Sequence, residues 1–271
     1  MPVITISRGT FSGGKDLAEC LAEKLGLECV SRELLTEAAQ QYGVDADELN
    51  DALEKPPGFW DRMSWKRQVY LAHLRETLCQ HAQSGKFVYH GHAGHFLLGG
   101  ISHVLRVLVI ADMDFRIDQA MQAKHLTRAA AESHIQTVDE QRRKWTRFLY
   151  NADWRDPFQF DLTVNLQKIT IEDACQVVTR MTELPAFHST PASRATLVDA
   201  EIAAAAEAAL LEDKDTRLRK LQVDAVNGVV TVRGVGYSPQ DVETVKAVLG
   251  RLDRVKGVRT ELAFSGGIEQ G

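Results

Sequence analysis

The chain has 271 residues, and at about 150 residues per domain it has room for two domains of ordinary size. Hydrophobic residues make up 44% of it and charged residues 25%, a mixture typical of globular proteins in water. The net charge of −5 argues against a general nucleic-acid binder, which would carry a basic excess.

Cysteine spacing and hydropathy indicate the cellular compartment in which the protein works. The four cysteines form no C-x-x-C pair, so we expect buried, reduced thiols and neither a disulfide framework nor a zinc site. No basic stretch followed by an apolar one opens the chain, and no apolar run is long enough to span a bilayer. We therefore expect a cytoplasmic protein with no integral membrane segment.

Strands and helices alternate through the first two thirds of the chain, which predicts a parallel sheet with helices on both faces. Apolar runs such as LRVLVI, residues 105–110, suit strands that are covered on both sides. The expected strands are residues 3–6, 29–30, 87–90, 105–110 and 162–165. The expected helices are residues 15–25, 31–41, 68–83, 115–124, 128–149 and 171–181, with a polar, Pro-rich segment at 44–65.

The pattern changes after Leu184. Residues 185–197 contain two prolines and several small polar residues, which predicts a linker between a domain at 1–184 and a second at 198–265. The second domain should run as helix 199–211, strands 221–226 and 229–233, helix 239–252 and strand 258–264. Asn227-Gly228 between the two strands predicts a tight hairpin, because both turn residues must adopt positive φ. The order α-β-β-α-β predicts a small α+β fold.

A glycine-rich loop opens the chain. Residues 9–15, GTFSGGK, match the pattern G-x-x-x-x-G-K between a predicted strand and a predicted helix. Such a loop turns backbone N–H groups toward a phosphate, and the helix adds the positive end of its dipole. The alternative is a turn that only links strand to helix. We assign the phosphates of ATP to Gly9, Thr10, Phe11, Ser12, Gly13, Gly14, Lys15 and Asp16.

Asp16 follows Lys15 where phosphate loops usually carry Ser or Thr, whose hydroxyl binds Mg²⁺. An aspartate here could bind the metal directly or through water, could repel the triphosphate, or could cap the helix. We assign Asp16 as the Mg²⁺ ligand, so the expected cofactors are ATP and Mg²⁺.

Four stretches together resemble the cytidylate kinase-like family over residues 2–182. They are ITISRGTFSGGKDLAECLAEKLGLECVSRELL, FVYHGHAGHFLL, VLRVLVIADMDFRI and TVDEQRRKWTRFLYNADWRDPFQFDLTVNL. That family commonly has an acidic residue after the basic one, as Asp16 follows Lys15. The resemblance implies a P-loop, three-layer fold that transfers the γ-phosphoryl group of ATP to CMP or dCMP.

The resemblance also implies site residues. Arg142 and Arg143 are the expected lid arginines and, with Lys15, the catalytic residues; their alternative is a solvated helix face beside Asp139 and Glu140. Acceptor binding is assigned to Arg8, Arg32 and His92. His92 is a departure, because the family has arginine after the glycine of this stretch. Asp161 and Asn165 match family positions, and we expect them to hold the fold.

Residues 198–264 resemble a BON domain. The matching segments are DAEI at 199–202, VNGVVTVRG at 226–234 and GVRTEL at 257–262. This resemblance implies an interaction or regulatory module with a protein or an acidic lipid surface as partner. The basic residues Lys214, Arg217, Arg219 and Lys220 could meet such a surface, or form only a solvated stretch.

Two functions are consistent with these features. The first is an ATP-dependent nucleoside monophosphate kinase with an attached BON module, with a nucleotide substrate and no nucleic-acid partner. The second is a nucleotide-binding sensor that has lost phosphoryl transfer and acts through the BON domain. His92 and Asp16 favour the second, whereas Lys15 and the arginine pair favour the first.

Overall fold

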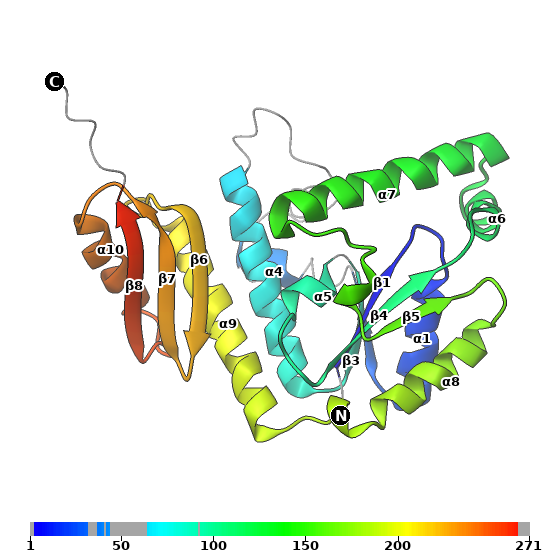
Figure 1. Cartoon of the computed structure of the whole chain (residues 1–271), viewed down its shortest axis with the longest axis horizontal. Helices are drawn as coiled ribbons and strands as arrows, with labels where there is room; N and C mark the ends of the chain where they lie inside the picture. Colours follow the sequence, from blue (N-terminus) through cyan, green and yellow to red (C-terminus); the bar gives the residue numbers. More distant parts are fainter. Residues whose placement is uncertain (1–2, 32–36, 41, 44–63, 92, 265–271) are drawn as a thin grey trace. The chain divides into compact units, whose positions relative to one another are not determined.

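A computed structural model describes residues 3–31, 37–40, 42–43, 64–91 and 93–264. By packing, the chain divides into two compact units, Met1–Phe59 with Ser84–Ser193, and Trp60–Gln83 with Arg194–Gly271. Figure 1 labels their elements. Each unit has its own sheet, so each is described separately.

A parallel five-stranded sheet forms the centre of the first unit, as the apolar runs predict. Its order is β2-β3-β1-β4-β5, so β1 is the central strand and pairs with β3 and β4. The strands are β1 (Val3–Arg8), β2 (Glu28–Val30), β3 (Phe87–His90), β4 (Val104–Ile110) and β5 (Leu162–Asn165). The helices of this unit include α1 (Gly14–Leu25), α5 (Gly94–Leu97), α6 (Met113–Lys124), α7 (Arg128–Tyr150) and α8 (Ile171–Thr182), with short 3₁₀ turns η1 (Pro157–Gln159) and η2 (Pro185–Phe187). Residues 37–40 are also helical.

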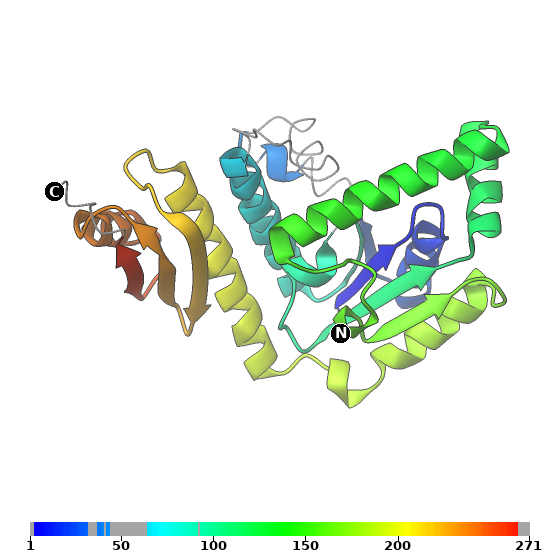
Figure 2. The ribbon, with the colours of Figure 1, turned by 45° about the horizontal axis from the view of Figure 1, so that its top comes forward.

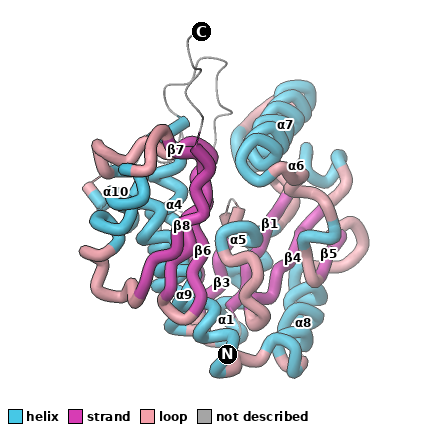
Figure 3. Tube along the Cα trace, turned by 60° about the vertical axis from the view of Figure 1, so that its left-hand side comes forward, coloured by secondary structure: helices cyan, strands magenta, loops and turns pink. Residues whose placement is uncertain are grey.

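Side-chain alternation along β1 divides the unit into layers. Ile4 and Ile6 face α1 and α8 in the main apolar core. Ser7 faces the other way, toward α5, where its hydroxyl lies 2.7 Å from Nδ1 of His95. The stacked rings of Phe96 and Tyr150 join α5 to the end of α7 on that side. Helices therefore cover both faces of the sheet, as expected for a buried parallel sheet (Figure 3).

The second unit contains a three-stranded sheet of order β6-β7-β8. Its elements are α4 (Ser64–Ser84), α9 (Pro191–Glu212), β6 (Arg219–Val226), β7 (Val229–Gly236), α10 (Gln240–Leu249) and β8 (Gly257–Phe264). The β6–β7 hairpin turns at Asn227 and Gly228, with φ of 53° and 80°, which confirms the predicted turn. From α9 onward the order is the predicted α-β-β-α-β.

Two features differ from the sequence predictions. The segment 185–197, predicted as a linker, contains η2 and the first turns of α9. Helix α4 precedes β3 in the chain but groups with α9. Nε2 of His73 lies 2.8 Å from Oε1 of Glu212, and the amide of Gln83 donates to Glu201. Because the contacts advance along α4 while they go back along α9, the two helices run antiparallel.

Candidate functional site

The glycine-rich loop joins the carboxyl end of the central strand β1 to the amino end of α1. Gly13, with φ of 83°, is the N-cap of α1 and makes no side-chain cap. A Cβ built on Gly13 would lie 2.7 Å from Leu166, and one on Gly14 would lie 2.6 Å from the Arg8 side chain. The backbone N–H groups in the first turn of an α-helix have no intrahelical acceptor. They and the helix dipole make this end of α1 suited to an anion.

Hydrogen bonds hold the loop to the end of β4. The hydroxyl of Ser12 lies 2.9 Å from the carbonyl oxygen of Gly9 and 3.0 Å from that of Val109. The N–H of Gly9 donates to the same Val109 oxygen at 3.2 Å. Ser12 is fully buried. These hydrogen bonds fix the loop to the sheet.

Phe11 connects the loop to the helical hairpin α6–α7. It has φ of 59°, a backbone conformation that residues with a Cβ rarely adopt. Its side chain packs against the small apolar cluster of Ile117, Ala120, Ala131 and Ile135. Backbone strain of this kind persists where the surrounding structure holds it in place, and it is enriched at functional sites. Here the packing of the Phe11 ring against this cluster holds the backbone in its positive-φ conformation.

A cavity of about 430 Å³ lies between the loop, α6 and α7. Figure 2 shows α7 running above the loop that follows β1. Seven of the eight predicted phosphate-binding residues line the cavity, Thr10 to Asp16, and so do Arg8 and Arg142. The remaining lining residues are Gln119, Ala123, Lys124, His134, Val138 and Gln141. Four cations, Arg8, Lys15, Lys124 and Arg142, thus face one carboxylate, Asp16, which favours a ligand with several negative charges.

Lys15 forms a weak, exposed ion pair with Glu19. Its ammonium group lies 3.4 Å from Glu19, and the two side chains are 63% and 54% exposed. An exposed i, i+4 pair of this kind contributes about 0.3–0.5 kcal/mol, because solvent screens it. A phosphate in the cavity can therefore replace Glu19 at little cost.

Sequence reasoning missed Lys124 and His134 on the cavity wall. Nζ of Lys124 lies 3.2 Å from Nε2 of His134, and it also lies over the Phe11 ring. Burial, and then the charges of Lys124 and Arg142, lower the pKa of His134. His134 is therefore neutral at pH 7, and the cationic charge of this wall comes from the lysine. Neither residue belongs to a pattern that marks a phosphate site.

The two predicted lid arginines occupy different positions on α7. Nη1 of Arg142 donates to the carbonyl oxygen of Arg8 at 3.2 Å, which brings its guanidinium to the cavity. Arg143 instead pairs with Glu140, one turn back on the same helix, at 2.8 Å. The cavity is not lined by Arg143, whose catalytic role stays a prediction.

The acceptor side is described in part. Arg32 and His92 lie outside the described residues. Nη1 of Arg8 lies 2.7 Å from Nδ1 of His90, at the end of β3. The structure therefore brings Arg8 to both the phosphate cavity and the strand that leads to His92.

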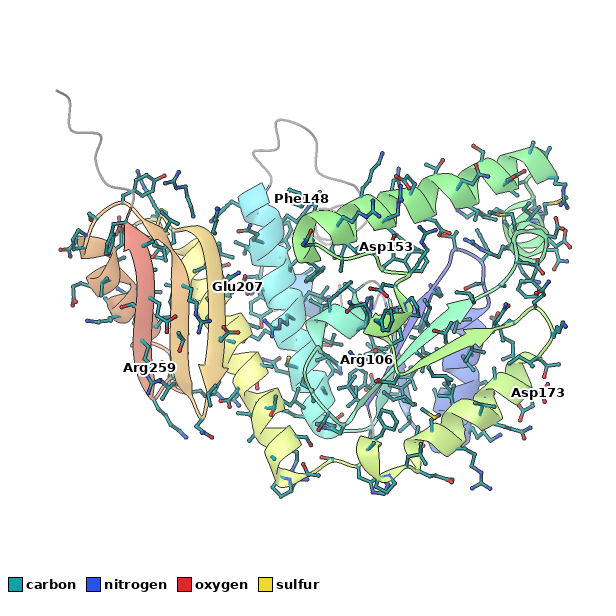
Figure 4. All side chains as sticks on the ribbon, in the orientation of Figure 1. Arg106, Phe148, Asp153, Asp173, Glu207 and Arg259 are labelled. Carbon is teal, nitrogen blue, oxygen red and sulfur yellow. The ribbon has the colours of Figure 1, made fainter. Side chains whose placement is uncertain are left out.

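Asp161 and Asn165 bind groups of the fold itself. The carboxylate of Asp161 accepts hydrogen bonds from the backbone N–H and the guanidinium of Arg106, at 2.8 to 3.1 Å. Figure 4 labels Arg106, which lies on β4. Oδ1 of Asn165 accepts the N–H of Gln167 at 3.0 Å. These contacts join β4 to β5 and shape the turn after β5, in agreement with the structural role expected for both residues.

A metal ion would have few protein ligands here. Within the described residues, no group of three or more His, Cys, Asp or Glu side chains could hold an ion. Among the described residues that line the cavity, Asp16 supplies the one carboxylate. This fits Mg²⁺, which is commonly bound by one or two carboxylates together with substrate phosphates and water.

The first two thirds of the chain are similar to known proteins. Residues 3–168 match the model of the Cytidylate kinase-like family. A protein described as cytidylate kinase from Archaeoglobus fulgidus is 25% identical over 185 residues, which cover 67% of this chain and 94% of the relative. Another of that name from Desulfurococcus amylolyticus is 30% identical over 182 residues, covering 66% and 91%.

A solved structure shows the same fold. The crystal structure of an uncharacterized protein from Eubacterium ventriosum is 18% identical, covers 68% of this chain and 99% of its own, and has a TM-score of 0.54.

In the described part of the chain no helix is long and apolar enough to cross a membrane. The family match spans the loop, the cavity and the strands that carry them, and the chain belongs to the cytidylate kinase-like family.

Proposed function

We propose that the chain is an ATP-dependent nucleoside monophosphate kinase whose acceptor is CMP or dCMP. The observation that carries this proposal is the cavity at the amino end of α1, where Arg8, Lys15, Lys124 and Arg142 surround an anion-binding helix terminus. The acceptor is inferred from the two relatives, which are described as cytidylate kinases.

In this proposal the chemistry needs positioning and charge more than covalent help. A phosphate oxygen of the monophosphate attacks the γ-phosphorus, the bond from that phosphorus to the β–γ bridging oxygen breaks, and ADP leaves. Backbone N–H groups at the start of α1 hold the β-phosphate. Lys15 and Arg142 bind the equatorial oxygens, on which charge is spread during transfer.

Arg8 would orient the acceptor from the end of β1, since its guanidinium already lies next to His90. Mg²⁺, held by Asp16 and phosphate oxygens, would neutralise charge between the β- and γ-phosphates. Phe11, Val138 and the α6–α7 wall would limit the access of water, which otherwise competes with the monophosphate for the γ-phosphorus.

The test is direct. Purified protein, ATP and Mg²⁺ are combined in turn with CMP, dCMP, UMP, AMP and GMP, and ADP release is followed while ATP binding is measured by calorimetry. Turnover fastest with CMP or dCMP is expected. ATP binding without turnover on any monophosphate would overturn the kinase and favour the sensor, and absence of both would overturn nucleotide binding.

We also propose that the segment from α9 to β8 is a BON-like interaction module. Its order α-β-β-α-β matches that expectation. Four basic residues near the start of β6 are all exposed: Lys214 and Arg217 between α9 and β6, and Arg219 and Lys220 at the beginning of β6. Co-sedimentation with vesicles of phosphatidylglycerol, compared with phosphatidylcholine, tests an acidic lipid surface as the partner. Equal binding to both vesicles, or to neither, would remove that partner and leave a protein partner as the alternative.

A further inference from the structure

The sequence places Asp139 beside Arg142 and Arg143 on what could be a solvated face of α7. The structure turns it inward, since its side chain is only 15% exposed. Oδ1 of Asp139 accepts the backbone N–H of Thr10 at 3.1 Å and the Thr10 hydroxyl at 2.7 Å. An aspartate of α7 therefore binds the second residue of the glycine-rich loop.

Arg116 on α6 completes this contact. Its guanidinium pairs with Oδ2 of Asp139, and its Nε donates to the carbonyl oxygen of Thr10 at 2.8 Å. Only 11% of the Arg116 side chain is exposed. The backbone N–H, the carbonyl and the hydroxyl of Thr10 are thus all bonded to one ion pair, whose two members come from different helices.

The loop sequence makes room for this ion pair. A Cβ built on Gly9 would lie 3.2 Å from Cζ of Arg116, closer than such contacts normally are. The first glycine of the G-x-x-x-x-G-K pattern therefore lets the guanidinium approach the backbone. Its own N–H bonds to Val109, and its carbonyl oxygen accepts the Ser12 hydroxyl.

Asp139 and Arg142 lie on the same face of α7. Residues three apart on a helix are neighbours on one face. Asp139 bonds Thr10 and Arg142 bonds the carbonyl oxygen of Arg8, so one face of α7 is attached to the chain on both sides of Gly9. If the first attachment is lost, the second alone must orient the helix and its arginine at the cavity.

We propose that Asp139 and Arg116 form a positioning pair, which holds α7 on the phosphate loop and thereby orients Arg142 toward the polyphosphate. The pair touches the loop backbone and not the reacting atoms. This inference rests on the proposed function for its consequence in phosphoryl transfer, but the attachment of α7 can be tested without any nucleotide.

The first readout needs no ligand. Hydrogen exchange of peptides covering the loop and α7 is compared between the wild type, Asp139→Ala and the matched control Glu132→Gln, which removes one exposed carboxylate from the same helix. Faster exchange of both peptides in Asp139→Ala alone is expected, because the Thr10 amide and α7 lose their contact. Unchanged exchange would overturn the positioning pair.

The second readout is a double-mutant cycle of Asp139→Ala and Arg142→Ala, measured as ATP affinity and as kcat with the monophosphate. Each single variant should reduce kcat at least tenfold. The double variant should be no worse than Arg142→Ala, because Asp139 acts through that arginine. Asp139→Asn, which keeps one acceptor for Thr10 but not the charge for Arg116, should fall between wild type and Asp139→Ala.

Two outcomes in the cycle would overturn the proposal. Additive losses would show that Asp139 acts independently of Arg142, and faster exchange with unchanged kcat and ATP affinity would show a purely structural contact. Wild-type protein that binds no ATP would instead overturn the proposed function, and the exchange measurement would still decide whether the pair holds α7 to the loop.

Discussion

Two turns of this molecule, one in each unit, are bound by an aspartate from a helix. Asp139 of α7 accepts the N–H of Thr10 in the phosphate loop. Asp199 of α9 accepts the N–H groups of Asn227 and Gly228 in the β6–β7 hairpin, at 2.8 and 2.9 Å. In both cases a carboxylate stabilises backbone with positive φ close by, at Phe11 and at the hairpin pair.

The turns differ in which donors remain. In the hairpin, both central N–H groups are bonded to Asp199. In the loop, Asp139 bonds only the start, and the N–H groups at the beginning of α1 face a cavity lined by Arg8, Lys15 and Arg142. An aspartate at a turn thus does not distinguish a structural turn from a binding one. The position of the remaining donors does.

The largest effect should come from Lys15→Ala. We expect kcat/KM to fall by about 100- to 1000-fold, as for the loss of one preorganised donor to a transition state. The melting temperature should stay unchanged, because Lys15 is exposed and has only a surface partner. Calorimetry with ATP, steady-state kinetics and thermal unfolding measure this. Lys246→Ala is the control, because it removes another exposed lysine that pairs with a glutamate of its own helix. Unchanged ATP affinity in Lys15→Ala would make the loop a turn like the hairpin.

Replacing the matching glycines compares the two turns directly. Gly13 and Gly228 have φ of 83° and 80°, so alanine is strained at either position, by about 1–2 kcal/mol. At Gly13 the new Cβ also meets Leu166 at 2.7 Å, and overpacking adds about 1–3 kcal/mol. At Gly228 its nearest neighbour is the flexible Lys256 side chain. Urea unfolding should show roughly 3 kcal/mol lost for Gly13→Ala and about 1 kcal/mol for Gly228→Ala. Equal losses would contradict the close approach at Gly13.

Acid should weaken the first unit through His95. Burial, and then the charge of Arg106, lower the pKa of His95 to about 3. The folded state thus favours the neutral ring. The contribution of the neutral His95 ring to the free energy of unfolding is complete above pH 6.5. It is lost as the pH falls from 6.5 toward 3, by about 1.4 kcal/mol per pH unit.

Unfolding by urea at pH 7, 6 and 5 measures this loss. His95→Gln keeps a polar group near Ser7 but does not titrate, so its stability should fall less steeply than that of the wild type. Parallel curves for the two proteins would show that His95 is not the group that titrates.

The smallest effect should come from Asp199→Asn. The amide retains one acceptor oxygen for two N–H groups, so the hairpin should lose about 1 kcal/mol, as with a weakened helix cap. ATP affinity should not change, because the hairpin belongs to the second unit. Urea unfolding measures the loss of stability, and calorimetry measures the ATP affinity. A change in ATP affinity would contradict a purely structural role of the hairpin turn.

Local signals predicted much of this structure. LRVLVI became the buried strand β4, and Asn227-Gly228 became the hairpin turn. Each of these depends on neighbours in the sequence, through alternation of side chains or the φ that glycine permits. The glycine-rich loop between β1 and α1 was predicted in the same way, and its role as a phosphate site stays a prediction.

Contacts between distant residues were beyond such signals. Thr10 and Asp139 are 129 positions apart, and nothing in DEQRRK shows which carboxylate turns inward. The wall formed by Lys124 and His134 depends on how α6 and α7 fold back on each other. The grouping of α4 with α9 likewise depends on pairs such as His73 with Glu212, which are 139 positions apart. Charge patterns along a helix do not contain this information.

The antiparallel pairing of α4 and α9 has a consequence for dissection of the gene. A cut after Leu184 follows the composition of the chain, yet it removes Glu201 and Glu212, the partners of Gln83 and His73. During synthesis α4 leaves the ribosome well before α9 exists, so this pair can form only after translation has passed the whole sheet of the first unit. An early segment of the polypeptide thus completes its packing only with a late one. A fragment that ends at Leu184 would lack the partners of α4 and would not represent the full chain.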